Sequence, residues 1–150
     1  MNYYRISSCL LLLCCVISLH TKAAQRHSEP PWLNDLQVLT SAQMAGRKAG
    51  TPAAKEVAQY LQTRLQQLGY HTALQEFTFK KGFFDSAQGY NVISTDCTVN
   101  CVVIGAHFDH LGHKGNKLYG GRNENASGVA ALLHLAQQLQ PYKQHITFAA

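Results

Sequence analysis

Two short stretches decide the fold of this chain: residues 105–112 read GAHFDHLG and residues 121–128 read GRNENASG. The first continues an apolar run at 102–104, which predicts a strand buried on both faces, as in a helix-covered sheet. The second leads into a helical pattern over 126–140, which a proline ends. Residues 145–150 begin another strand. This order of strand, loop, helix and strand is typical of a crossover unit with parallel strands.

Three side chains in these stretches suggest metal chemistry. His107 and Asp109 follow the expected strand directly, and Glu124 precedes the next helix. Ligands of open α/β sheets bind beyond the carboxyl ends of the strands, so these side chains can converge in one crevice. Histidine nitrogen and carboxylate oxygen are usual ligands of catalytic zinc. A ligating histidine needs a partner on its other ring nitrogen, and Asp109 is a candidate for that role.

Other interpretations of this region stay open. His107 alone would suit a hydrogen-bonded structural histidine at a strand end. His110 and His113 could join His107 in a histidine-rich metal site, although the glycines at 112 and 115 indicate a loop. Ser127 lacks the glycine pattern of a nucleophile elbow, and the chain contains no phosphate-binding loop of the Walker type.

The rest of the chain shows local signals for short elements. Thr51 and Pro52 are typical of a helix N-terminus, and Gly69 of a helix end. Two apolar runs, at 90–95 and 101–106, are separated by a polar turn and predict a hairpin. The remaining expected elements are a helix over 32–44, a loop over 45–50, a strand over 70–79 and a loop over 80–88.

The first residues resemble an export signal. Arg5 precedes an almost wholly apolar run at 9–19, and small residues follow it. We interpret 1–24 as a cleaved signal peptide and 25–38 as a linker or N-terminal segment. The protein would then be periplasmic or secreted. The apolar run is shorter than the roughly 20 residues that span a bilayer, so no stable membrane anchor is expected, with a retained anchor as the alternative.

Cysteine and charge patterns narrow the possible partners. Export would leave Cys97 and Cys101 as the mature cysteines, and in an oxidising compartment they suggest a disulfide, with two free thiols as the alternative. The formal charge of +5 comes from basic residues scattered along the chain without interleaved aromatics. Nucleic-acid binding is therefore not expected. The sequence leaves the oligomeric state open.

From residue 39 onward the chain resembles the zinc-dependent exopeptidase family of bacterial leucyl aminopeptidases and glutamate carboxypeptidases. Four motifs carry the resemblance: Met44-Ala45-Gly46-Arg47 with Gly50-Thr51-Pro52, Tyr90-Asn91-Val92-Ile93, the stretch from Val103 to Gly112, and the stretch from Asn125 to Leu133.

The resemblance implies a three-layer α/β/α phosphorylase/hydrolase-like fold, of which residues 39–150 form the N-terminal part of the catalytic domain. It also implies two zinc ions that activate one water against a peptide substrate. His107 would bind one zinc, Asp109 would orient His107, and Glu124 would bridge the two ions. The expected activity is that of an aminopeptidase.

The chain departs from the family pattern in two respects. Glu124 stands where the family has aspartate, and Asn123 replaces a second acidic residue. The general base and the later metal ligands of the family have no counterpart within these residues. We therefore expect a chain truncated after its first crossover unit, inactive alone, with 145–150 as an exposed apolar edge. The alternatives are a non-catalytic relic and a periplasmic zinc-binding, histidine-rich protein.

Overall fold

The computed structural model describes residues 29–150, so the signal peptide predicted for 1–24 and the first residues of the 25–38 segment lie outside the described residues. The elements are α2 (Pro31–Thr40), the 3₁₀ turn η1 (Ala45–Arg47), α3 (Pro52–Gln67), β1 (Thr72–Lys80), β2 (Ser86–Ser94), β3 (Val102–Gly105), β4 (Gly112–Lys114), β5 (Lys117–Tyr119), the π-helical turn η2 (Arg122–Ala126), α4 (Ser127–Gln138), the 3₁₀ helix η3 (Gln140–His145) and β6 (Ile146–Ala149). Within residues 29–150, no helix has both the length and the apolar character needed to cross a membrane.

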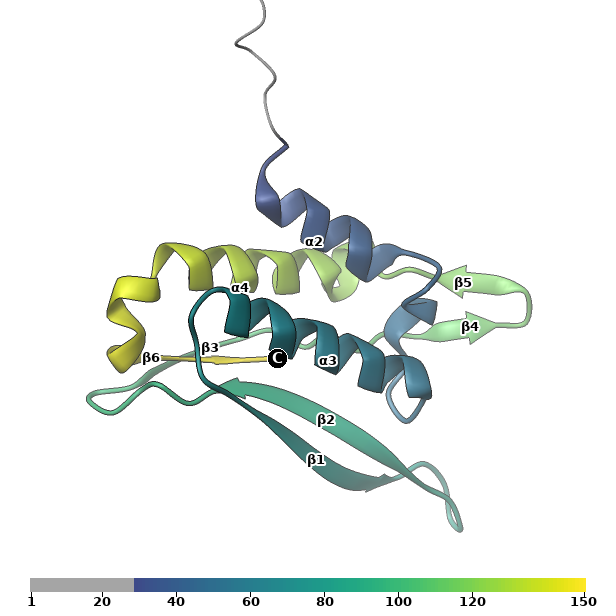
Figure 1. Ribbon diagram of the computed structural model, residues 1–150. Coiled ribbons are helices and arrows are strands. Elements are labelled where there is room, and N and C mark those ends of the chain that lie inside the picture. The colour runs from purple at the N-terminus through teal and green to yellow at the C-terminus, as the bar shows by residue number, and fades with distance from the viewer. Residues whose placement is uncertain (1–28) are drawn as a thin grey trace, which may run out of the picture.

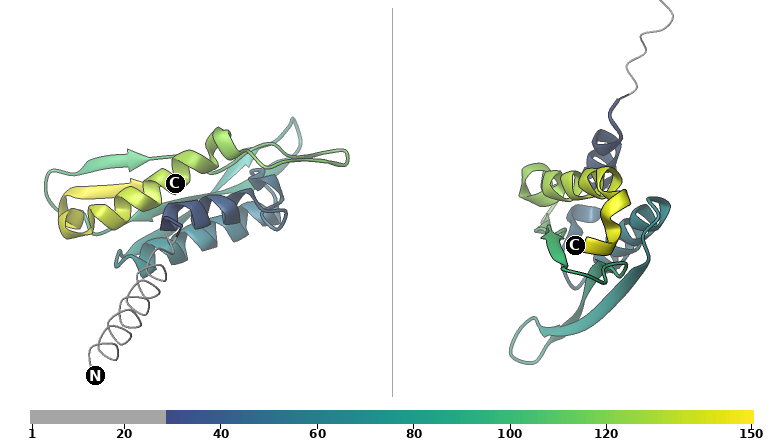
Figure 2. Two further views of the ribbon diagram at one scale, coloured as in Figure 1. Left: turned by 90° about the horizontal axis from the view of Figure 1, so that it is seen from above. Right: turned by 90° about the vertical axis from the view of Figure 1, so that its left-hand side faces the viewer.

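A four-stranded mixed sheet forms the centre of the fold, in the order β1-β2-β6-β3. β2 is antiparallel to β1 and β6, while β3 is parallel to β6. The helices α2, α3 and α4 of the described residues lie on one side of this sheet (Figures 1 and 2). The α/β fold class and the β3-α4-β6 crossover are therefore confirmed. The described residues comprise the sheet and one of the expected helical layers.

The expected hairpin between the strands at 90–95 and 101–106 is wrong. β2 pairs along its whole length with β1, from Thr72–Ser94 to Lys80–Ser86, and β6 lies between β2 and β3. The expected apolar edge at 145–150 is wrong for the same reason, because β6 is an inner strand. It pairs with β3 over its whole length and with β2 at Ile93–Ala149, which no local sequence signal reveals.

The loop between β2 and β3 carries two cysteines. Cys97 and Cys101 form a disulfide, with their sulfur atoms 2.05 Å apart. The main-chain N–H groups of Thr98 and Val99 donate to the carbonyl of Gln144, at 3.0 and 3.2 Å. The loop is thereby attached to η3, at the end of the sheet away from the metal-site motifs.

The expectation that β3 is buried on both faces is also wrong for the described part of the chain. Val102 is 60% exposed and Val103 is 66% exposed. β3 is an edge strand, and its second face carries no helix within residues 29–150. The apolar sequence of β3 predicts burial, but these residues are largely exposed in the structure.

The hydrophobic core lies between the helices and the inner face of the sheet. Its fully buried members include Leu39, Val57, Leu61, Leu65, Val92, Val129, Ala136 and Phe148. In α4, Val129, Leu132, Leu133 and Ala136 are buried, whereas Leu135 is 41% exposed. At the start of α3, the hydroxyl of Thr51 donates to the carbonyl of Lys48 and does not cap the helix. Pro52 at the first turn remains the helix-starting signal.

α2 packs as part of this core, although the sequence suggests a linker for much of it. It ends at Thr40, before the Met44 limit that the sequence suggests, because Ser41 has an extended backbone. Its Asp35 is buried and accepts hydrogen bonds from Arg64 of α3 at 2.7 and 3.1 Å. This ion pair holds α2 against α3.

One buried arginine connects several loops at the other end of the sheet. Arg47, in η1, is 0% exposed and donates four hydrogen bonds to main-chain carbonyl oxygens. Its Nε donates to Phe108 at 2.7 Å and its Nη2 to Gly121 at 3.0 Å. Its Nη1 donates to Leu39 at 2.6 Å and to Gly120 at 2.7 Å. Both loops that carry the predicted metal-site residues are therefore bound to one guanidinium group.

The backbone of Arg47 completes this connection. Its carbonyl accepts a hydrogen bond from the N–H of His110 at 3.0 Å. Burial lowers the pKa of Arg47 from its ordinary value, and the charge of Asp109 partly opposes that effect. The ordinary pKa of arginine lies far above neutrality, so the guanidinium remains a donor to these carbonyls.

A buried carboxylate joins the start of β1 to η3. Asp96 is 5% exposed, accepts a hydrogen bond from the main-chain N–H of His71 at 2.8 Å, and lies 3.3 Å from Nζ of Lys143. Burial alone would raise the pKa of Asp96, but the hydrogen bonds from His71 and Lys143 together lower it. The carboxylate form is therefore stabilised in the folded protein.

We predict that Arg47→Met lowers the free energy of unfolding by at least about 3 kcal/mol, because buried carbonyl oxygens of three segments lose their donor. Urea unfolding followed by circular dichroism measures this loss. The matched control is Lys48→Met at the exposed neighbouring position, which should change stability by no more than about 0.5 kcal/mol. A loss of less than about 1 kcal/mol for Arg47→Met would contradict the connecting role.

A second prediction concerns acid stability. Because the pKa of Asp96 is lower in the folded than in the unfolded chain, its contribution is complete above the ordinary value of 3.8 and is lost as the pH falls through the folded value. Asp96→Asn should cost about 1–2 kcal/mol at pH 7, and the difference from wild type should shrink in acid. Urea unfolding at a series of pH values tests this, with the exposed Asp85→Asn as control. A difference that is independent of pH would rule out the carboxylate as its cause.

Candidate metal site

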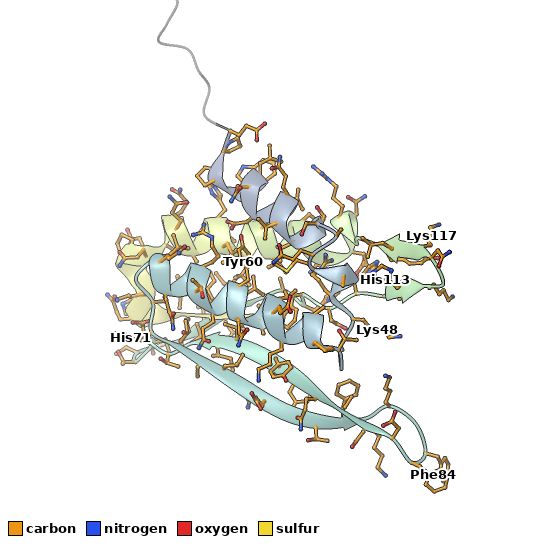
Figure 3. The ribbon with its side chains drawn as sticks, turned by 45° about the vertical axis from the view of Figure 1, so that its right-hand side comes forward. Lys48, Tyr60, His71, Phe84, His113 and Lys117 are labelled. Atoms are coloured by element: carbon orange, nitrogen blue, oxygen red, sulfur yellow. A yellow bond between two sulfur atoms is a disulfide. The ribbon has the colours of Figure 1, made fainter. Side chains whose placement is uncertain are left out.

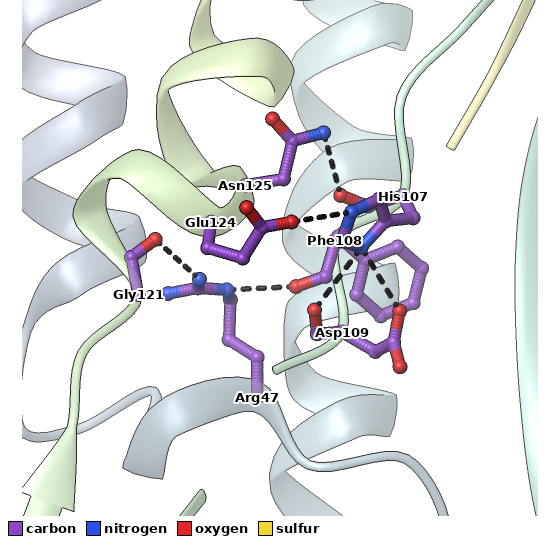
Figure 4. Close-up of polar contacts among 7 residues, drawn as sticks. All are labelled: Arg47, His107, Phe108, Asp109, Gly121, Glu124 and Asn125. Atoms are coloured by element: carbon purple, nitrogen blue, oxygen red, sulfur yellow. Dashed lines mark hydrogen bonds and ion pairs between the residues drawn. The ribbon is translucent and has the colours of Figure 1, made fainter. Parts of the chain in front are cut away.

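The predicted site residues come together at the edge where β3 and β6 end. His107 and Asp109 lie in the loop that follows β3, and Glu124 lies in η2, directly before α4 (Figure 4). The carboxyl ends of parallel strands and the entry of the following helix meet at this edge, which is the usual ligand position in open α/β sheets.

His107 contacts a carboxylate with each ring nitrogen. Its Nε2 lies 3.3 Å from Oε1 of Glu124. Its Nδ1 lies 3.2 Å from Oδ1 of Asp109 and 3.3 Å from the carbonyl oxygen of Asp109. Both oxygens beside Nδ1 are acceptors, and a carboxylate on one ring nitrogen is the contact that orients a metal-binding histidine in proteins. The orienting role of Asp109 stays a prediction.

The distance between His107 and Glu124 fits a zinc ion. Ligand atoms about 2.0–2.1 Å from a tetrahedral zinc lie about 3.3–3.4 Å from each other. This distance matches the separation between Nε2 of His107 and Oε1 of Glu124. The side chains of His107 and Glu124 are 54% and 72% exposed, so a metal ion could reach both of them.

The same region does not form a larger ligand cluster. Among residues 29–150, no group of three or more His, Cys, Asp or Glu side chains is placed to hold a metal ion. His110 and His113 therefore do not join His107 in a three-histidine site, and His113 lies on β4 in the small hairpin that projects from this edge. His107 and Glu124 therefore remain the two candidate ligands.

Close packing around Gly121 determines where Glu124 lies. Gly121 has a left-handed φ of 55°, and a Cβ atom there would approach the carbonyl oxygen of Glu124 and Cδ2 of His110, each at 2.5 Å. A side chain at this position would therefore displace the loop that carries Glu124. On the other side, Nδ2 of Asn125 donates to the carbonyl of His107 at 3.3 Å.

A cavity of about 290 Å³ opens beside His107 and Asp109. One part is polar and contains these two residues and Asn91, while the rest is apolar. The apolar lining consists of Ala49, Ala54, Phe77, Phe79, Gly89, Tyr90, Phe108 and Ala150. This combination of an apolar hollow and a few polar groups is typical of a small-ligand site.

Sequence reasoning did not assign roles to Arg47, Asn125 or the aromatic residues of this cavity. Arg47 and Asn125 each stand in a motif that carried the family resemblance, which was the available signal. Phe77 and Phe79 gave no signal, because alternate aromatic residues in a strand ordinarily indicate packing.

Comparisons with known proteins place the residues of this edge within a known family pattern. Residues 91–150 match the family model described as peptidase family M28. That segment contains β3, α4 and β6 and all three predicted site residues, together with most of the loops that surround them.

Solved structures show the same fold. A glutaminyl cyclase from Fimbriiglobus ruber matches with a TM-score of 0.65 and 18% identity, over 79% of this chain and 43% of that chain. A leucine aminopeptidase precursor from Bacteroides thetaiotaomicron gives 0.62 and 18%, over 77% and 45%. A Zn-dependent exopeptidase from Parabacteroides distasonis gives 0.56 and 21%, over 77% and 44%.

This chain thus spans less than half the length of each of these proteins. The order of its strands, the crossover unit and the two loops at the sheet edge agree with the motifs that first suggested the zinc-dependent exopeptidases. The resemblance to the zinc-dependent exopeptidases is confirmed: residues 91–150 match the model of peptidase family M28, and the described residues share the fold of these structures.

Proposed function

We propose that this chain contributes the first ligands of a zinc exopeptidase site of the aminopeptidase type, acting on peptides. The observation that carries the proposal is the placement of His107 Nε2 opposite the Glu124 carboxylate, with Nδ1 held by Asp109. This arrangement presents one neutral nitrogen and one charged oxygen to the same point, beside a cavity that opens to solvent.

The residues of the site would divide the work as follows. His107 and Glu124 would hold a zinc ion, and Asp109 would keep the histidine ring in the metal-binding tautomer. Zinc at this position would polarise a peptide carbonyl and lower the pKa of a water molecule. Two protein ligands are fewer than the three of an ordinary catalytic zinc site, so the family's second zinc and its general base require residues other than those described.

The adjacent cavity suggests the kind of peptide that would bind. Phe77, Phe79 and Tyr90 surround its apolar part, and His107 and Asp109 lie at its polar part. A bulky apolar side chain next to the scissile bond would bury its surface there, which is worth about 1.5–3 kcal/mol for a fully buried side chain. We infer a preference for such residues.

Export remains part of the proposal. The predicted signal peptide at 1–24 would deliver the protein to the periplasm or the medium, where a disulfide such as Cys97–Cys101 persists. Extracellular peptides would then be the substrates.

Glutaminyl cyclisation is a second candidate, because the Fimbriiglobus ruber glutaminyl cyclase has a higher TM-score, 0.65, than either of the two exopeptidases compared above. In that reaction the α-amine of an N-terminal glutamine attacks its own side-chain carboxamide and releases ammonia. Polarisation of a carbonyl at the same metal position would serve both reactions, so assays of the two products distinguish them.

We predict that the chain binds zinc through His107 and that Asp109→Asn weakens this binding about 10–100-fold, because the histidine loses the partner that orients it. Isothermal titration calorimetry measures the affinity, and His107→Ala should abolish binding at this site. The matched control is His110→Asn in the same loop, which should leave the affinity unchanged. Equal affinities for wild type and His107→Ala would show that the zinc lies elsewhere.

The isolated chain of 150 residues should release no N-terminal residue from an aminoacyl anilide and form no pyroglutamate from an N-terminal glutamine peptide. Its described residues offer two zinc ligands and place no further carboxylate as a general base. Absorbance of the released aniline and mass spectrometry of the peptide measure the two products. Zinc-dependent turnover that disappears in His107→Ala would contradict this expectation and identify the reaction.

A further inference from the structure

The hairpin of β1 and β2 extends well beyond the rest of the sheet. β2 pairs with β1 from end to end, but it contacts β6 only near Val92 and Ile93. The first half of β2 therefore projects past the carboxyl end of β6, on the same edge as the candidate metal site (Figure 1). Its turn is closed by the carbonyl of Asp85, which accepts hydrogen bonds from the N–H groups of Lys81 and Gly82 at 2.8 and 3.3 Å.

Two phenylalanines stand at the tip of this hairpin without any cover. Phe83 is 96% exposed and Phe84 is 101% exposed, and their ring centroids are 5.7 Å apart. They form a small apolar wedge on an ordered turn. Single exposed apolar residues are common on protein surfaces. Two adjacent, completely exposed aromatic rings at a projecting tip indicate instead a surface that contacts a membrane or another molecule.

Exposed lysines gather around the same edge. Lys80 and Lys81 precede the phenylalanines, and Asp85 follows them as the acidic residue of that tip. The second hairpin, β4–β5, carries Lys114 and Lys117 beside its turn and projects from the same side of the molecule (Figure 3). Within residues 29–150, none of these four lysines forms an ion pair, whereas Lys143 and Arg64, elsewhere in the fold, are paired with Asp96 and Asp35.

We propose that this edge docks on an anionic lipid surface. Phe83 and Phe84 would enter the boundary between headgroups and acyl chains, and the four lysines would lie against anionic headgroups. Aromatic rings beside lysines suit that interface, where each lysine adds attraction to a negatively charged leaflet. A second copy of the chain is a poorer occupant, because it would bring two sets of unpaired lysines together.

The proposal stands apart from the zinc chemistry, since none of its residues is a predicted ligand. Docking in this orientation would place the candidate metal site, which lies between the two hairpins, near the membrane surface. Substrate peptides held at the membrane surface would then reach the site without leaving the membrane.

A tryptophan probe at the tip tests this proposal in the full chain. Trp32→Phe removes the native tryptophan, and Phe84→Trp places one at the wedge. With vesicles of phosphatidylcholine and phosphatidylglycerol that contain brominated acyl chains, we expect a shift of the emission to shorter wavelength and quenching by bromine. Adding Lys80→Gln and Lys81→Gln should weaken vesicle binding about tenfold or more.

The control probe is Tyr142→Trp in the same background, because Tyr142 is 58% exposed and lies in η3, at the opposite end of the sheet. It should show neither shift nor quenching. Each probe reports its own position, so binding through the apolar run at 9–19 would not produce the expected pattern.

Several results would overturn the proposal. An unchanged Phe84→Trp spectrum with anionic vesicles would exclude insertion of the wedge. An equal response with pure phosphatidylcholine vesicles would exclude the role of the lysines. A shift that grows with protein concentration in the absence of vesicles would assign the wedge to contacts between copies of the chain.

Discussion

The site edge of this protein depends on one guanidinium group. Arg47 is buried, and it donates hydrogen bonds to carbonyls from the end of α2, from the loop after β3 and from the loop before α4. Buried carbonyl oxygens need donors, and these irregular segments cannot supply them to one another. A single planar group with five N–H bonds supplies them all, which explains why lysine would not be equivalent there.

The residue that holds the loops of the site, Arg47, is not one of the residues proposed to bind the metal. The loops are held by a group that solvent does not reach, while His107 and Glu124 point into solvent at their ends. A metal site needs ligand atoms at defined separations, and the backbone beneath them has to be rigid for that. The 3.3 Å between Nε2 of His107 and Oε1 of Glu124 therefore depends on the backbone contacts beneath both loops as well as on the contact of His107 with Asp109.

Much of the architecture near the site was predictable, and much of the sheet was not. The crossover unit, the ends of α3 and the convergence of His107, Asp109 and Glu124 follow from local patterns and chain order. The partner of β2 was predicted wrongly, because pairing with β1 or β3 depends on where β6 enters the sheet. The exposure of Val103 was missed, since an apolar triplet indicates a strand but does not say which layers cover it.

The sequence by itself determined the elements and the chemical groups: a strand that ends before a histidine and a carboxylate, a helix that begins after a glutamate, and a metal-binding composition at both. These properties are local, since they depend on residue type and spacing within one turn or strand. Only the tertiary structure decided the role of Arg47, the order of the strands, and the projection of the β1–β2 and β4–β5 hairpins from the same side of the molecule. Those features join residues that are distant along the chain, and their energies arise only when the backbone brings them together.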